Sequence, residues 1–166
     1  NEGWGQYDTV RIARWVEQYD PTRLTNSTSG WTDRGTGHIF DIHEYPGPAF
    51  EDKGDGRVPV LGEFGGLALA LPGHLWAEEG NWGYRSSGDK EALMRDYEAL
   101  IKSLHGPIAR GLAAAVYTQT TDVEREINGL LTYDRQVVKV DKDAVKALHA
   151  ELYRDMAPPA MFLATS

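Results

Sequence analysis

The sequence predicts an α/β fold with a parallel sheet, because segments with helical periodicity alternate with short apolar runs along the chain. The clearest apolar run, Val58–Gly62, reads Val-Pro-Val-Leu-Gly and has the length and character of a buried parallel strand. Polar and aromatic residues follow the predicted strands, which is where (β/α)-barrels and open α/β sheets both place their functional sites. The pattern by itself fits either architecture.

The first part of the chain is predicted to contain one helix and three strands. Apolar residues recur at helical spacing between Tyr7 and Gln18, so a helix is expected there. The strands are expected at Arg23–Asn26, Ile39–Ile42 and Val58–Gly62.

The second part begins with a loop rich in glycine and aromatic residues, Gly65–Gly88, which is too long to be a mere connection and is expected to be ordered and functional. A helix is predicted from Asp89, a strand at Leu112–Thr118 and a last helix at Lys142–Tyr153. The apolar face of the helix after Asp89 consists of Leu93, Tyr97, Leu100, Ile101 and Leu104. These four strands, with the end of another before Asn1, are about half of the eight that a barrel needs.

Composition favours one globular domain and excludes several functions. The chain has 166 residues, of which 41% are hydrophobic and 25% charged, as expected for a folded domain. Its net charge of -8 has the wrong sign for a nucleic-acid partner. No apolar run approaches the roughly 20 residues of a membrane span. Without cysteine the chain has no disulfide and fits an oxidising or a reducing compartment, so localisation stays open. Because the chain opens at Asn1 in the middle of a strand-end pattern, we expect it to be part of a longer protein.

Two glutamates are the candidates for acid and base chemistry. Glu2 and Glu63 both follow predicted strands, and both have a glycine beside them that allows a ligand to approach the backbone. Cleavage of a glycosidic bond needs such a pair, because one carboxyl protonates the leaving oxygen while the other attacks the anomeric carbon or activates water. The alternative is that each is a solvated loop glutamate.

Five segments in order resemble glycoside hydrolase family 2, the β-galactosidase and β-glucuronidase group. Two of them, Asn1–Trp4 and Leu61–Gly66, resemble its acid/base and nucleophile signatures. The other three are Thr25–Gly30, Asp41–Pro46 and Tyr117–Glu124. The resemblance implies a (β/α)8 TIM barrel, present as its C-terminal half from the end of strand 4 to helix 8. It places this catalytic part at residues 1–156 and leaves 157–166 as a tail.

The resemblance also implies the roles of the site residues in a retaining, double-displacement hydrolysis of β-O-glycosidic bonds. Glu2 would be the acid/base and Glu63 the nucleophile, while Asn1 would bind the sugar 2-hydroxyl. His43 and Tyr45 would line the site, with the Tyr45 hydroxyl donating to Glu63. A histidine at a strand end is as often a structural residue, and the resemblance favours Tyr45 over His43 because the family pattern places a tyrosine there.

Two tryptophans of the long loop are further candidates for substrate binding. Trp76 and Trp82 could stack on the apolar faces of sugar rings, or could pin the loop to the fold, and we expect one of the two to contact substrate. The five histidines have no spacing typical of a metal site, so no metal or other cofactor is expected.

Two alternatives to an active hydrolase remain. The chain could be an incomplete barrel that only binds carbohydrate or is inactive, because the first three strands are absent from it. It could also cover its open edges by pairing with a copy of itself. The expected partners are therefore a β-glycoside and either a missing N-terminal barrel half or a second copy.

Overall fold

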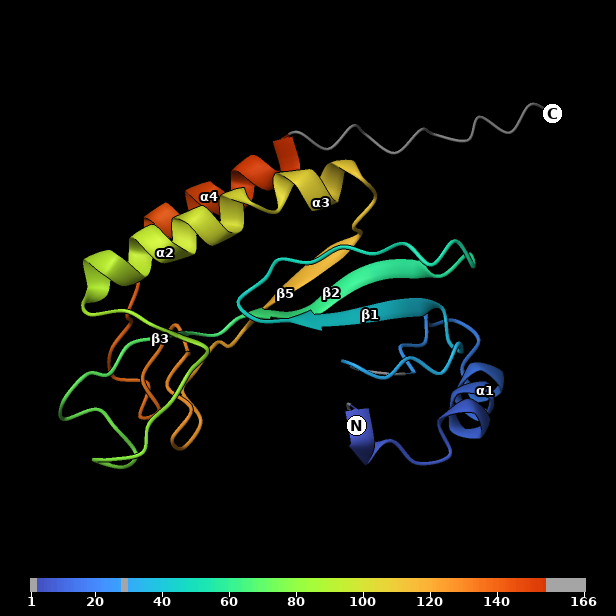
Figure 1. Cartoon of the computed structure of the whole chain (residues 1–166), viewed down its shortest axis with the longest axis horizontal. Coiled ribbons are helices and arrows are strands. Elements are labelled where there is room, and N and C mark those ends of the chain that lie inside the picture. Colours follow the sequence, from blue (N-terminus) through green and yellow to red (C-terminus); the bar gives the residue numbers. More distant parts are fainter. Residues whose placement is uncertain (1–2, 28–29, 155–166) are drawn as a thin grey trace.

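The computed structural model describes residues 3–27 and 30–154, and Figure 1 shows their arrangement. The helices are η1 (Gly3–Gly5), α1 (Thr9–Tyr19), α2 (Lys90–Lys102), α3 (His105–Ala109) and α4 (Lys142–Arg154). The strands are β1 (Ile39–Glu44), β2 (Val58–Gly65), β3 (Leu67–Ala68), β4 (Arg85–Ser86) and β5 (Ala114–Thr118). The helices predicted near Tyr7, Asp89 and Lys142 are confirmed within one or two residues, whereas α3 was not predicted.

The main sheet has three parallel strands in the order β1-β2-β5, and β3 and β4 form a separate two-stranded sheet. Helices α2, α3 and α4 lie together on one side of the main sheet, whereas α1 lies on the other side near β1 (Figure 1). The long segments after β2 and β5 extend beyond the carboxyl ends of these strands. The carboxyl ends of parallel strands therefore meet at one place, as ligand sites in α/β proteins require.

The core lies between the main sheet and helices α2 and α4. The predicted apolar face of α2 is buried there, and Asp89 caps the helix by accepting a hydrogen bond from the Ala92 amide at 2.6 Å. Leu148 of α4 packs against the same cluster. The buried residues of the cluster are Leu61, Phe64, Leu67, Leu69, Leu93, Tyr97, Leu100, Ile101, Leu104, Leu112 and Leu148.

The predicted (β/α)8 barrel, including its description as a C-terminal half-barrel, is wrong for the described chain. The prediction needs four strands and the end of a fifth in one sheet, whereas the main sheet of the described residues has three strands, β1-β2-β5, with β1 and β5 at its edges. The segment predicted as a strand at Arg23–Asn26 forms none, although the Thr25 carbonyl accepts from the amides of His38 and Ile39. Alternation of helices and strands is a local pattern and does not determine closure.

The face of the main sheet opposite α2 and α4 is covered at β1, where Asp41 and His43 are buried, but exposed at β5. Neighbouring residues of a strand point to opposite faces, and Tyr117 of β5 packs against the core cluster. Val116 therefore points to the other face, where 54% of it is exposed. Helix α1 is also poorly covered, because Ala13 is its one buried residue. Its exposed apolar residues are Val10, Ile12, Trp15, Val16 and Tyr19.

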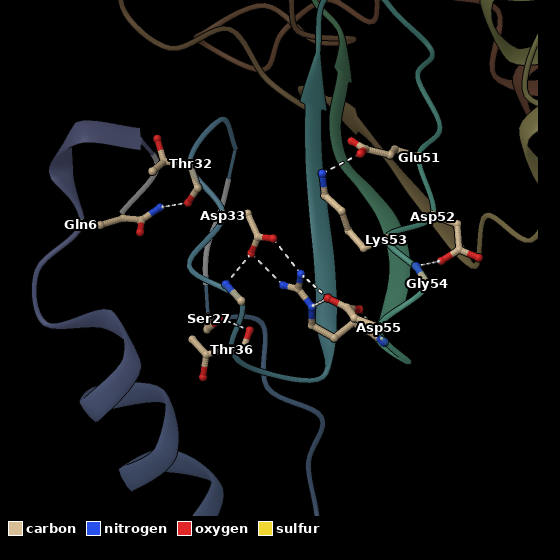
Figure 2. A network of polar contacts seen from close by, with 12 residues as sticks. Gln6, Ser27, Thr32, Asp33, Thr36, Glu51, Asp52, Lys53, Gly54 and Asp55 are labelled. Carbon is tan, nitrogen blue, oxygen red and sulfur yellow. Dashed lines mark hydrogen bonds and ion pairs between the residues drawn. The ribbon is translucent and has the colours of Figure 1, made fainter.

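A bidentate ion pair holds the loop of residues 30–38. The Arg57 guanidinium donates to both carboxylate oxygens of Asp33 at 2.7 Å each, and its Nε donates to Asp55 at 2.8 Å. The hydrogen bonds with Arg57 lower the pKa of Asp33 to about 2. Figure 2 shows this cluster beside a second contact, in which the Gln6 side chain donates to the Thr32 carbonyl at 2.6 Å. The loop is thus attached both to the start of β2 and to the N-terminal segment.

A buried lysine joins the two long segments beyond the strand ends. Lys139 is 1% exposed, and its ammonium group donates to Asp122 at 2.7 Å. It also donates to the carbonyls of Leu69 at 3.0 Å and Ile127 at 2.9 Å. The segment after β2 and the segment after β5 are therefore held together by one side chain.

Candidate functional site

Glu63 lies at the carboxyl end of β2, and its side chain is 34% exposed. The Tyr45 hydroxyl donates to Glu63 Oε2 at 2.6 Å, and His43 Nδ1 lies 3.2 Å from the same oxygen. In the described part of the chain, both of these contacts are made through Oε2. The carboxylate is therefore held on one side by two groups that can donate a proton in a hydrogen bond.

A break in the strand register turns Glu63 away from the core. Ile42 of β1 pairs with Leu61, but the next pair is His43 with Glu63, so Gly62 is an extra residue in β2. Such a bulge reverses the direction of the side chains that follow it. Leu61 and Phe64 consequently both lie in the core although they are three residues apart, and Glu63 points to the opposite face.

Asp41 and His43 form a buried pair behind Glu63. Asp41 is 4% and His43 2% exposed, and His43 Nε2 lies 3.6 Å from Asp41 Oδ2. The same oxygen accepts a hydrogen bond from the side-chain amide of Asn26 at 2.7 Å. The Asp41 carboxylate lies directly against Gly62, where an added Cβ would come within 2.0 Å of Oδ1. The histidine ring is therefore placed between two carboxylates, one that is buried and one at the surface.

Trp31 connects this pair to the N-terminal segment. Its Nε1 donates to the His43 carbonyl at 3.1 Å, and its ring meets the His43 ring edge-on with centroids 5.9 Å apart. On the other side, a Cβ placed on Gly3 would lie 3.7 Å from Trp31 Cε3. Gly3 thus lies within contact distance of a residue that packs on the site.

The Tyr45 ring is fixed by a second aromatic residue. Tyr84 stacks on it with ring centroids 3.8 Å apart and planes 5° from parallel. Burial, followed by the hydrogen bond to Glu63, raises the pKa of the Tyr45 hydroxyl well above its usual value. The hydroxyl therefore keeps its proton at any physiological pH and acts as a donor toward the carboxylate.

The structure brings some of the predicted residues together and leaves others apart. His43, Tyr45 and Glu63 meet at one place, whereas Asn1 and Glu2 lie outside the described residues. Trp82 is joined to the cluster through Tyr84, which it meets edge-on at 5.7 Å. Trp76 is 62% exposed and contacts Tyr133, which is not part of the cluster.

Four residues of the site, Asn26, Trp31, Asp41 and Tyr84, were not predicted from the sequence. Asp41 precedes His43 by two positions in a strand, so the period of two could have placed both on one face. Asn26 stands in a segment that carries the family resemblance, but nothing local connects it to Asp41. Tyr84 is separated from Tyr45 by 39 residues (84 minus 45), and no sequence signal indicates their stacking.

Two kinds of function receive no support in the described ranges. No group of three or more His, Cys, Asp or Glu side chains there is arranged to hold a metal ion. None of the helices in residues 3–27 and 30–154 combines the length and the apolar character needed to cross a membrane.

Comparisons with known proteins add no family assignment. No protein family model matches the chain, and no curated protein matches it. The resemblance to glycoside hydrolase family 2 therefore rests on the sequence segments given above.

Proposed function

We propose that the chain carries the catalytic carboxylates of a retaining β-glycoside hydrolase, with Glu63 as nucleophile and Glu2 as acid/base. The observation that carries the proposal is that two side chains contact the same oxygen of the Glu63 carboxylate. Tyr45 and His43 both contact Oε2, so Oε1 is the oxygen directed at a substrate. A carboxylate held by donors on one oxygen has a fixed orientation and therefore a defined direction of attack.

In the proposed reaction, Glu63 attacks the anomeric carbon while Glu2 protonates the leaving glycosidic oxygen. The bond to the leaving group breaks and a glycosyl ester forms on Glu63. Glu2 then removes a proton from water, which attacks the anomeric carbon, displaces Glu63 and retains the configuration. Asn1 would bind the 2-hydroxyl of the sugar.

The position of Gly3 supports a role for the glutamate that precedes it. Gly3 lies against Trp31, and Trp31 packs on His43, which contacts Glu63. We expect the carboxyl groups of Glu2 and Glu63 to lie about 5–5.5 Å apart, and a separation near 9 Å in a ligand complex would indicate an inverting reaction instead.

The test is the rescue of a nucleophile variant by azide. Glu63→Gly should abolish release of nitrophenol from p-nitrophenyl β-glycosides, tested with galactose, glucose, glucuronic acid, mannose and xylose as the sugar. Sodium azide should restore part of the rate and give a glycosyl azide of inverted configuration, because azide fills the position of the removed carboxylate.

Glu44 provides the matched control, because it is an exposed glutamate at the end of the neighbouring strand. Glu44→Gly should keep the parent rate and show no azide effect. If Glu63→Gly hydrolysed the same substrate as fast as the parent chain, Glu63 would not be the nucleophile.

A further inference from the structure

We infer that Trp82 and Tyr84 form a binding platform for a second sugar ring, so that the ligand of this site is a β-linked oligosaccharide. The inference deepens the proposed function, since it names the substrate class of the same site. In the segment Trp82–Tyr84, hydrogen bonds hold the backbone, while the large aromatic rings of Trp82 and Tyr84 are exposed.

The backbone of the segment is held between two other parts of the chain. The Trp82 amide donates to the Arg125 carbonyl and the Trp82 carbonyl accepts from Ile127, both at 2.9 Å. The Tyr84 amide donates to the Gly66 carbonyl at 3.0 Å. Between them, Gly83 lies so close to Ala68 that an added Cβ would come within 2.4 Å of the Ala68 Cβ. The flanking side chains therefore point away from Ala68.

The rings of both residues remain exposed. Trp82 is 47% and Tyr84 45% exposed, and their rings meet edge-on with centroids 5.7 Å apart. Because backbone hydrogen bonds already hold the segment, the rings are not needed to anchor it. Two half-exposed aromatic rings on a fixed backbone form a rigid apolar surface, which costs little conformational entropy when it binds a ligand.

The platform is continuous with the proposed nucleophile. Tyr84 stacks on Tyr45, and the Tyr45 hydroxyl donates to Glu63. The backbone of Gly66 lies beneath both rings, where an added Cβ would come within 2.4 Å of Tyr84 and 3.1 Å of Tyr45. Two aromatic rings thus separate the carboxylate from Trp82. The inference therefore assigns the sugar cleaved at Glu63 to the carboxylate and the ring linked to it to Trp82 and Tyr84.

A sugar ring is the ligand that fits this surface. One face of a pyranose carries C–H groups and is apolar, while its edge carries hydroxyls, so it stacks on aromatic rings and keeps its hydroxyls in water. The Trp82 indole N–H and the Tyr84 hydroxyl add polar groups at the border of the surface.

The test measures binding in the Glu63→Gln background, in which bound saccharides are not consumed. The probes are tetrasaccharides of β-1,4-linked glucose, galactose, mannose and xylose and of β-1,3-linked glucose, each compared with its methyl β-monoglycoside by calorimetry. We expect at least one tetrasaccharide to bind tenfold or more tightly than its monoglycoside. Trp82→Ala should remove that gain and leave the affinity for the monoglycoside unchanged.

Two further variants make the result specific. Trp82→Phe keeps an aromatic ring and should keep part of the gain. Trp15→Ala removes a more exposed tryptophan from α1 and should change nothing. The inference would be overturned if no tetrasaccharide bound more tightly than its monoglycoside, or if Trp82→Ala weakened both ligands equally.

The outcome also separates this inference from the proposed hydrolysis. Binding that depends on Trp82, in a chain with no turnover of any glycoside, would leave the platform standing and refute the hydrolase. Turnover that is lost in Glu63→Gly, with equal affinities for tetrasaccharide and monoglycoside, would refute the platform alone.

Discussion

Replacing Lys139 by methionine should destabilise the fold strongly, because it leaves a buried carboxylate without its partner. The Lys139 ammonium group is buried together with Asp122, whose side chain is 2% exposed. Removal of one member of a buried ion pair costs about 3–5 kcal/mol of the free energy of unfolding. Two backbone carbonyls, those of Leu69 and Ile127, also lose their charged donor. We therefore expect a loss in this range at pH 7.

The loss should depend on pH with a defined sign. Burial raises the pKa of Asp122, and Lys139 opposes this effect, so the pKa will rise further in the variant. A carboxyl with a higher pKa in the folded state binds more protons there than in the unfolded state. Stability then falls as the pH rises above about 4 toward the raised pKa. The Lys139→Met variant should accordingly be least impaired at low pH and increasingly impaired toward neutrality.

Urea unfolding between pH 4 and pH 8 measures this effect through the transition midpoint and its slope. Lys146→Met, which removes an exposed lysine of α4, is the control and should change the free energy by less than about 0.5 kcal/mol. The double variant Asp122→Asn/Lys139→Met should recover part of the loss, because no charge remains buried. A loss below about 1 kcal/mol that does not change with pH would refute the reasoning.

Four other outcomes are expected. Gly62→Ala should cost about 1–3 kcal/mol and lower the melting temperature, because the new methyl group overlaps the Asp41 carboxylate; an unchanged melting temperature would contradict the close contact. The contact with Arg57 contributes up to about 1 kcal/mol to the free energy of unfolding above pH 4, and this contribution is lost as the pH falls toward 2. Asp33→Asn should remove it, and identical acid-unfolding curves for the variant and the parent chain would count against this prediction. Tyr45→Phe should lower the hydrolysis of a nitrophenyl β-glycoside about tenfold to a hundredfold, and an unchanged kcat would show that its hydroxyl does not support the reaction. The isolated chain should self-associate, because the β5 part of one sheet face and the apolar residues of α1 are exposed, and a compact monomer in sedimentation velocity at low concentration would disprove this.

The sequence predicted strand β2 but not the direction in which the Glu63 side chain points. The apolar run Val58–Gly62 was enough to predict the strand and to place Glu63 at its end. Strict alternation, however, would put Glu63 on the same face as Leu61, in the core. The register shift at Gly62 reverses this, and the Asp41 carboxylate of the neighbouring strand lies against that glycine. A contact between strands cannot be read from either strand alone.

The predicted barrel failed for a related reason. Helical and strand periodicity predicted α1, α2, α4 and the three strands of the main sheet correctly, and these signals extend over only a few residues. Closure of a sheet depends on pairing between its first and last strands, which are far apart in the sequence. The same limit applies to α1, because the spacing of its apolar residues predicted the helix but not that most of these residues are exposed.

The sequence by itself determined the local structure and the chemical groups that this protein can use. The spacing of apolar residues, the Asp89 cap and the short apolar runs predicted most of the elements, because each depends on neighbours along the chain. Only the tertiary structure decided that the sheet is open, that His43 stands between Asp41 and Glu63, and that Tyr84 stacks on Tyr45. These features depend on register and on packing between distant segments, which local periodicity does not encode.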